Sequence, residues 1–336
     1  MRKIKLYPSN IEINCDDGQS VLSALEKHGH ALPNNCRAGA CGECKVKVRS
    51  GTFDQGFVLA MALKEDEKAQ GFGLMCMARP TSDILEIEWG DETARPKLFG
   101  AEENRVFMVT EKTMVTDKIL KLRLRSLGPP MRFWPGQNIQ LGSKDLNIPY
   151  RSYSIANIPG PEGEIILFVT KIKEGTTSAW IHDILAVGEK IKINGPYGTF
   201  IGDPNTNTPV LCLAAGSGLA PIESLSLGAL LRGGFKNPVT ILFSAQYEKD
   251  IFELGTFKFL ESKFRNFKFK ATLTQEKSPK YLEGRIPQLL PTLYPDLSKS
   301  SIYICGSVAF VRDCKEAALK LKARPELIYI EEFVSA

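Results

Sequence analysis

The stretch CRAGACGEC (Cys36–Cys44) places three cysteines in nine residues, and a fourth cysteine follows at Cys76 after 31 intervening residues. The spacing is Cys-x4-Cys-x2-Cys with one distant partner. Zinc usually takes its cysteine ligands from two short paired arms. A loop of three cysteines closed by one distant cysteine is instead the arrangement that holds a 2Fe–2S cluster. The stretch therefore favours an iron–sulfur site.

The two glycines of this stretch support the same interpretation. Gly39 and Gly42 tolerate the backbone angles that turn N–H groups toward cluster sulfurs. A four-cysteine zinc site and a reduced structural loop are the alternatives. Cys15, Cys212 and Cys314 lie outside the cluster, and we interpret them as ordinary buried cysteines. The predicted metal ligands are Cys36, Cys41, Cys44 and Cys76.

The residues on both sides of the loop have the pattern of one small α+β domain. IKLYPSNIEINC (4–15) predicts two short strands and SVLSALEKHG (20–29) a helix. CKVKVRS (44–50) and ILEIEW (84–89) alternate apolar and polar residues and predict two more strands. We expect this domain to span residues 1–92, followed by a polar linker over 93–104.

The pattern of apolar and polar residues changes twice after the linker. Residues 105–203 contain six strand-like runs at short spacing, which predicts an antiparallel barrel. Residues 204–336 alternate apolar strands with helices, as in VLCLAAGSGLAP (210–221), which predicts a doubly wound parallel sheet. The expected fold is therefore multidomain, with one α+β part, one barrel and one α/β part.

The bulk composition excludes several classes of function. The chain has 336 residues, 43% hydrophobic and 24% charged, which fits two or three globular domains. The net charge of +5 gives no case for nucleic-acid binding. We find neither a signal peptide nor a run of 18 apolar residues, so we expect a cytoplasmic protein without membrane insertion.

Several motifs, read together with the cysteine loop, resemble a known family. Residues 1–92 resemble a plant-type ferredoxin domain with a β-grasp-type fold, and the remainder resembles the ferredoxin–NADP reductase superfamily. The matching motifs are WPGQNIQL (134–141), RSYS (151–154), GTTS (175–178), GPYGTF (195–200), AAGSGLAP (214–221), YICGS (303–307) and YIEEF (329–333). The resemblance implies a 2Fe–2S cluster, an FAD-binding barrel over 105–203 and an NAD(P)H-binding domain over 204–336.

The order of the domains resembles two groups of reductases. One comprises the reductase components of bacterial multicomponent oxygenases and hydroxylases. The other is the CDP-6-deoxy-glucoseen reductase of deoxysugar biosynthesis, which differs only in its partner, a sugar dehydrase. A more distant hypothesis is a zinc-stabilised, non-redox adaptor that binds nucleotide. Relatives that use FMN carry their ferredoxin domain at the other end, so the order favours FAD.

The resemblance also implies the flavin site. Arg151 would bind a flavin phosphate, Tyr153 would pack on the flavin, and Ser154 would lie near flavin N5. The start of a helix at 175–178 would bind the diphosphate. Near the C-terminus, Glu331 is assigned to the reaction. The remaining cofactor-binding residues of this part are Gly175, Thr177, Ser178 and Phe333, with 334–336 extending past the motif.

The nicotinamide site is expected at the glycine-rich turn. Gly216, Gly218 and Pro221 lie between a buried strand and a helix, the context that a dinucleotide loop requires. By resemblance, Cys305 lies beside the nicotinamide C4. Gln246 stands where NADPH-dependent relatives often have Arg, with Glu248 and Lys249 close by. We therefore expect NADH as the electron donor, with NADPH as the alternative.

These assignments predict one chain of electron transfer, from NADH through FAD and the 2Fe–2S cluster to an acceptor protein. We expect the acceptor to dock over the cluster loop near Arg37, Ala38 and Ala40, and the chain to be monomeric by itself. The three histidines have no partners at metal-ligand spacing, and we interpret them as structural. They are His28, His30 and His182.

Overall fold

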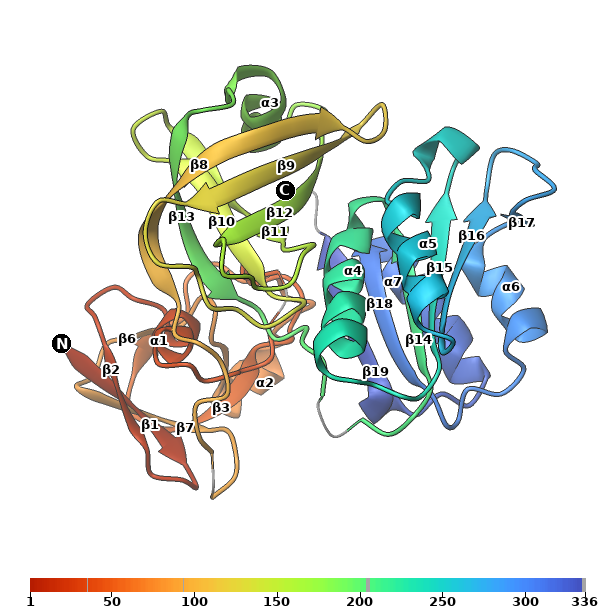
Figure 1. Ribbon diagram of the computed structural model, residues 1–336. Helices are drawn as coiled ribbons and strands as arrows, with labels where there is room; N and C mark the ends of the chain where they lie inside the picture. Colours follow the sequence, from red (N-terminus) through yellow and green to blue (C-terminus); the bar gives the residue numbers. More distant parts are fainter. Residues whose placement is uncertain (35, 93, 204–205, 334–336) are drawn as a thin grey trace. The chain divides into compact units, whose positions relative to one another are not determined.

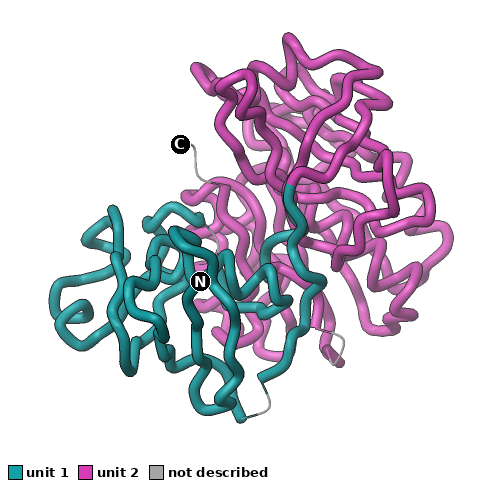
Figure 2. Tube along the Cα trace, turned by 90° about the vertical axis from the view of Figure 1, so that its left-hand side faces the viewer, with its two compact units in different colours: residues 1–103, 195–199 teal, residues 104–194, 200–336 magenta. Residues whose placement is uncertain are grey.

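The computed structural model describes residues 1–34, 36–92, 94–203 and 206–333, which form two compact units (Figures 1 and 2). Unit 1 comprises Met1–Glu103 and Gly195–Thr199, and unit 2 comprises Asn104–Asn194 and Phe200–Ala336. The predicted linker begins at residue 93 and the predicted nucleotide domain at residue 204. Both residues lie outside the described ranges, as do residues 334–336.

Unit 1 contains a five-stranded sheet in the order β2-β1-β7-β3-β5 and a two-stranded sheet of β4 and β6. In the larger sheet, β1 and β7 are parallel and the other pairs are antiparallel, which confirms the β-grasp fold. The elements are β1 (Arg2–Tyr7), β2 (Glu12–Cys15), α1 (Val21–Lys27), β3 (Lys45–Ser50), β4 (Phe53–Asp54), α2 (Glu65–Ala69), β5 (Phe72–Leu74), β6 (Arg79–Pro80) and β7 (Ile84–Glu88).

The core of unit 1 follows directly from the alternation in the sequence. Ile4 and Leu6 point to the same face of β1, and the helix α1 buries Leu22 and Leu25 in the same cluster. Ser20 caps α1, because its hydroxyl accepts the backbone N–H of Ser23 at 3.3 Å. Helix α1 thus has a defined start at Val21, 15 residues before the first cluster cysteine.

The first part of unit 2 is an antiparallel six-stranded sheet in the order β11-β10-β13-β8-β9-β12. A bridge between Ile155 and Leu167 joins its two ends, which gives the predicted barrel. Strand β8 begins at Glu102, so residues 102–104 belong to a strand rather than to the predicted linker. The elements are β8 (Glu102–Met114), β9 (Ile119–Ser126), β10 (Asn138–Ser143), β11 (Ile148–Ser154), β12 (Glu164–Thr170), α3 (Thr176–Ala179) and β13 (Lys190–Tyr197).

The second part of unit 2 is a six-stranded parallel sheet in the order β17-β16-β15-β14-β18-β19. This confirms the predicted doubly wound domain. The elements are β14 (Val210–Ala215), α4 (Leu219–Leu227), β15 (Val239–Ala245), α5 (Leu254–Lys263), β16 (Phe267–Leu273), β17 (Leu282–Glu283), α6 (Ile286–Leu293), β18 (Ser301–Ser307), α7 (Val308–Lys320) and β19 (Ile328–Phe333).

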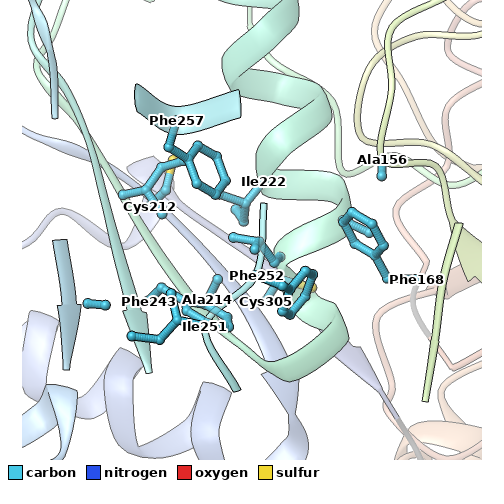
Figure 3. Close-up of a cluster of buried hydrophobic side chains, with 14 of the residues drawn as sticks. Ala156, Phe168, Cys212, Ala214, Ile222, Phe243, Ile251, Phe252, Phe257 and Cys305 are labelled. Atoms are coloured by element: carbon cyan, nitrogen blue, oxygen red, sulfur yellow. The ribbon is translucent and has the colours of Figure 1, made fainter. Parts of the chain in front are cut away.

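Two hydrophobic clusters cover the faces of this sheet. One joins the sheet to α6 and α7, and the other joins it to α4 and α5. The second cluster also contains Ala156 and Phe168 of the barrel, as Figure 3 shows. Phe168 meets Phe252 edge to face with ring centroids 5.0 Å apart. The barrel and the parallel sheet therefore share one core. Across the described residues, no helix has the length and hydropathy needed to cross a membrane.

Candidate functional site

The cysteine loop of unit 1 directs its backbone N–H groups at sulfur. The Cys36 Sγ accepts the N–H groups of Ala38, Ala40 and Cys41 at 3.4, 3.3 and 3.3 Å. Gly39 lies between these donors with φ of +71°, and a Cβ there would lie 2.8 Å from the Phe57 carbonyl oxygen. The glycine is therefore required both by the left-handed backbone and by the close approach of another segment.

The four cysteines are arranged as two pairs. The Cys41 thiol hydrogen-bonds Cys36 and lowers the pKa of Cys36, and the Cys44 thiol does the same for Cys76. The Cys44 Sγ also accepts the Cys76 N–H at 3.4 Å. In the described part of the chain, no three His, Cys, Asp or Glu side chains are grouped around one metal position. Two thiol pairs with N–H donors match a cluster that takes two sulfur ligands at each iron.

The three loop residues expected near the docking partner differ in exposure. Ala38 is exposed and Ala40 is half-buried, in agreement with a surface that a partner can reach. The Arg37 guanidinium instead turns inward, with Nη1 2.6 Å from Glu26 Oε1. The buried carboxylate of Glu26 in α1 holds the Arg37 side chain inside the unit, and docking of the acceptor near this loop stays a prediction.

The flavin motif of unit 2 lies on β11, paired with β10. Arg151 is opposite Leu141 and Tyr153 is opposite Ile139, so both project from the same face of the strand. The Arg151 side chain is exposed, whereas Tyr153 packs against the barrel core and burial raises the pKa of its phenol. Arg151 is thus accessible to an anion, and Tyr153 forms the wall beside it.

Three residues that are far apart in the sequence meet at the next position of this strand. The Ser154 Oγ lies 3.3 Å from both carboxyl oxygens of Glu331, and the Cys305 Sγ lies 3.8 Å from Glu331 Oε2. Ser154 and Cys305 are buried and Glu331 is half-buried. Burial raises the pKa of Glu331 to about 8, against the hydrogen bonds from its neighbours. Glu331 is therefore mostly protonated at neutral pH.

A fourth member of this group escaped the sequence analysis. The Asn138 side chain also hydrogen-bonds Glu331, and its buried Oδ1 has no hydrogen-bond partner among the described residues. Asn138 lies within the motif WPGQNIQL (134–141), and that motif was the available signal. An unsatisfied buried acceptor beside a protonated carboxyl fits a bound group that carries N–H donors, as the flavin ring does.

The hydroxyl groups of the loop after β12 bond to the protein's own backbone. Gly175 is the N-cap of α3. The Ser178 Oγ accepts the Ile172 N–H at 3.1 Å, and the Thr177 Oγ1 donates to the Pro149 carbonyl at 2.6 Å. The Thr177 hydroxyl holds this loop against β11, where the flavin motif lies, and the Ser178 hydroxyl bonds within the loop itself. Their direct contact with a diphosphate stays a prediction.

The glycine-rich turn after β14 combines open space with a close approach. Gly216 has φ of +56°, and no atom of the described residues lies within 4 Å of the position of a Cβ. At Gly218, a Cβ would lie 2.5 Å from the Cys305 carbonyl oxygen. Pro221 lies in the first turn of α4. The turn therefore presents bare backbone on one side and packs on β18 on the other, which fits a dinucleotide loop.

The loop after β15 uses its charges internally. The Lys249 Nζ pairs with the Asp117 carboxylate from the turn between β8 and β9. Glu248 accepts from Lys280 Nζ and from Ser278 Oγ, each at 3.2 Å. The cation that the sequence placed beside the cofactor is thus already paired with a carboxylate.

The remaining residues named in the sequence analysis have structural contacts. Phe333 is half-buried and packs against the core shared by the barrel and the parallel sheet. Ser307, the last residue of YICGS (303–307), caps α7 by accepting the Phe310 N–H at 3.3 Å. The histidines bond backbone carbonyls or pack on an aromatic ring, and the three remaining cysteines are buried. These residues are His28, His30, His182, Cys15, Cys212 and Cys314.

Three family models match consecutive parts of the chain. The 2Fe-2S iron-sulfur cluster binding domain matches residues 4–81, the oxidoreductase FAD-binding domain matches 107–201, and the oxidoreductase NAD-binding domain matches 212–316. The matches follow the order of the β-grasp sheet, the barrel and the parallel sheet. They show that the cofactors of this fold are a 2Fe–2S cluster, FAD and a nicotinamide dinucleotide.

Whole-chain relatives agree with these matches. The reductase component of phenol 2-monooxygenase from Pseudomonas sp. (strain CF600) is 30% identical over 282 residues, which cover 84% of this chain and 78% of that protein. The reductase subunit of an aromatic O-demethylase from Amycolatopsis sp. is 28% identical over 333 residues, or 96% of each chain.

The solved structure of an Amycolatopsis cytochrome P450 reductase is 26% identical to this chain and covers 100% of it, with 99% of that chain aligned. The TM-score is 0.92. The chain therefore belongs to the ferredoxin–NADP reductase superfamily, as a 2Fe–2S flavin reductase of the family that includes oxygenase reductase components.

Proposed function

We propose that the protein passes electrons from NADH through FAD and a 2Fe–2S cluster to an oxygenase or hydroxylase component. The observation that carries this proposal is the meeting of Ser154, Cys305 and Glu331 in unit 2, together with the sulfur-directed loop of unit 1. FAD, when bound, supplies the conversion between the two electrons of NADH and the single electrons that an iron–sulfur cluster carries.

The buried group around Glu331 would control a proton at the flavin. Glu331 keeps its proton near neutral pH, because burial raises its pKa to about 8. Its two oxygens accept from Ser154, so the carboxyl group is held in one orientation beside β11. Cys305 adds a buried sulfur beside the same oxygen. A neutral, oriented acid of this kind can donate a proton to a reduced ring and take it back on reoxidation.

The other predicted residues would hold the three cofactors. Cys36, Cys41, Cys44 and Cys76 are proposed as the cluster ligands, since they form two thiol pairs. Arg151 would bind a flavin phosphate with its exposed fork. The bare backbone at Gly216 leaves room for the diphosphate of the dinucleotide.

The charges after β15 favour NADH over NADPH. This loop follows the carboxyl end of a parallel strand, where α/β domains bind the adenosine ribose of a dinucleotide. Lys249 is paired with Asp117, and the carboxylate of Glu248, which also accepts from Ser278 and Lys280, lies in the same loop. A carboxylate accepts hydrogen bonds from the ribose hydroxyls of NADH, and it repels the extra phosphate of NADPH.

The relatives named above support an oxygenase partner more than a sugar dehydrase, because their names identify a phenol monooxygenase and an aromatic O-demethylase. The acceptor would meet the exposed Ala38 side of the cluster loop. We further propose that the protein works as a monomer and in the cytoplasm. The cytoplasmic location is supported by the absence of a disulfide among its eight cysteines, as a reducing compartment favours.

Purified protein tests the proposal directly. We expect about two irons, about two acid-labile sulfides and about one FAD per chain, with the cluster reduced when NADH is added anaerobically. Electron paramagnetic resonance detects the reduced cluster. A colourless protein that contains zinc, or one whose flavin is not reduced by NADH, would refute the redox function. The partner is tested by adding candidate oxygenase components and measuring NADH-dependent product formation.

A further inference from the structure

Arg37 occupies an unusual position in the cluster loop. It follows Cys36 directly, and its backbone is in the left-handed region with φ of +54°. The guanidinium Nη1 lies 2.6 Å from Glu26 Oε1 and 3.4 Å from Asn34 Oδ1. The side chains of Arg37 and Glu26 are only 16% and 1% exposed. The strained backbone thus turns a long charged side chain into the interior of unit 1.

An aromatic ring covers the other side of the same guanidinium. The Arg37 Cζ lies 4.6 Å from the centroid of the Tyr197 ring, which is itself buried. Tyr197 belongs to the segment Gly195–Thr199, which forms part of unit 1. A guanidinium stacked on a ring and bonded at its edge to a carboxylate has little freedom to move.

Stability alone gives little reason for this arrangement. A buried ion pair contributes weakly to folding, because removing both charges from water offsets most of their attraction. The second oxygen of Glu26, Oε2, has no hydrogen-bond partner among the described residues, which adds a further cost. An uncharged residue of similar size would pack there at a lower cost in folding free energy. The charge of Arg37 therefore calls for another explanation.

The charge belongs to the residue next to a proposed cluster ligand. Arg37 directly follows Cys36 in the chain, and its guanidinium is held inside unit 1 and away from solvent. An arginine keeps its proton in proteins, so this positive charge is permanent. The cluster gains one electron, given by the reduced flavin, and with it one negative charge. Nearby charge and burial are among the factors that set the potential of such clusters.

We propose that Arg37, held between Glu26 and Tyr197, is the fixed positive charge that raises the reduction potential of the 2Fe–2S cluster and so favours electron transfer from reduced FAD. The inference rests on the proposed function, because it requires that the cysteines hold the cluster. Arg37 is a positioning residue in this account, acting on the cluster through its charge and not through contact with a substrate.

A redox titration of the full-length holoprotein measures the effect. For Arg37→Gln we expect the midpoint potential of the cluster to fall by about 59 mV or more, which is a tenfold change in a one-electron equilibrium. Glu26→Gln removes the opposing negative charge, so we expect a shift to higher potential. Arg37→Lys keeps the charge and should stay close to the wild-type value.

Arg49 provides a matched control in the same unit. Its guanidinium lies 3.4 Å from the centroid of the Tyr7 ring and pairs with Glu86 at 3.6 Å. It stands five residues beyond Cys44 along β3, which is about 16 Å of extended chain. That separation exceeds the screening length of about 8 Å at physiological ionic strength. We expect Arg49→Gln to leave the potential unchanged.

The signs of the shifts decide between a charge effect and a distorted loop. Opposite shifts for Arg37→Gln and Glu26→Gln support the proposal, and shifts in the same direction overturn it. An unchanged potential in Arg37→Gln also overturns it. If Arg37→Gln fails to retain iron, the Glu26→Gln and Arg37→Lys titrations still decide the question. A wild-type protein without a cluster would refute the proposed function itself, which iron and sulfide content reveals before any titration.

Discussion

Glu331→Gln gives the most informative perturbation of the flavin site. Glu331 joins Ser154 and Cys305, and glutamine has the same size but cannot ionise. In the folded protein the pKa of Glu331 is raised from its ordinary value of 4.5 to about 8. Between these two pH values, the folded state holds a proton that the unfolded state has released. The free energy of unfolding should therefore fall as the pH rises from about 4.5 to about 8.

The size of this effect follows from the difference between the two pKa values. At about 1.4 kcal/mol per pH unit, the change from 4.5 to about 8 corresponds to about 5 kcal/mol. Glu331 is half-buried, so solvent screening reduces the expected effect to about 2–3 kcal/mol. The contribution is present in full below the unfolded pKa and is lost by pH 8.

Urea unfolding measures this contribution when wild type and Glu331→Gln are compared at pH 5 and at pH 8.5. The release of FAD fluorescence follows the unfolding of unit 2, with FAD at one saturating concentration throughout, because ligand binding also stabilises the fold. We expect the stability of wild type relative to Glu331→Gln to fall by about 2–3 kcal/mol between the two pH values. A difference that stays constant, or that rises with pH, would refute the neutral carboxyl and with it the assigned proton donor.

Two further predictions concern the charges of unit 2. The ion pair between Lys121 and Glu253, 2.7 Å apart and mostly buried, joins the barrel to α5, so Lys121→Met should lower the free energy of unfolding by about 3 kcal/mol in urea titrations. Lys171, which is exposed and pairs with Asp183, provides the control: Lys171→Met should lower the free energy of unfolding by less than about 1 kcal/mol. Equal losses of stability in the two variants would contradict the argument. Asp117→Asn should free Lys249 to bind an extra phosphate, raising kcat/KM for NADPH relative to NADH several-fold in steady-state assays, and an unchanged ratio would show that this loop does not select the cofactor.

Local sequence patterns predicted the helices and strands, because each pattern depends only on the residues of one short segment. The alternation in β1 and the N-cap at Ser20 both act within a few residues. The glycines at 216 and 218 were predicted from their place between an apolar strand and a helix. The structure adds a left-handed backbone angle at Gly216 and a close approach of the Cys305 carbonyl at Gly218. The boundary before β8 was less predictable. Residues 102–104 are polar and have no strand-like pattern, yet they belong to the strand.

Contacts between distant segments were predictable only where a family motif marked both partners. Ser154 and Glu331 are 177 residues apart, and their meeting was expected only from two separate motifs. The inward turn of Arg37 depends on Glu26 in a helix, on a left-handed backbone angle and on a ring 160 residues away. The pairing of Lys249 with Asp117 likewise depends on how the barrel meets the parallel sheet, which no single pattern encodes.

The order of electron transfer is tested most directly by removing one cluster ligand. Cys41 donates its N–H to Cys36 and forms one thiol pair with it, so Cys41→Ser should abolish the cluster while leaving unit 2 intact. In stopped-flow experiments we expect NADH to reduce the FAD of Cys41→Ser at the wild-type rate, with reduction of added cytochrome c lost. Equal loss of both reactions, or cytochrome c reduction that persists without iron, would contradict an electron path that leaves through the cluster.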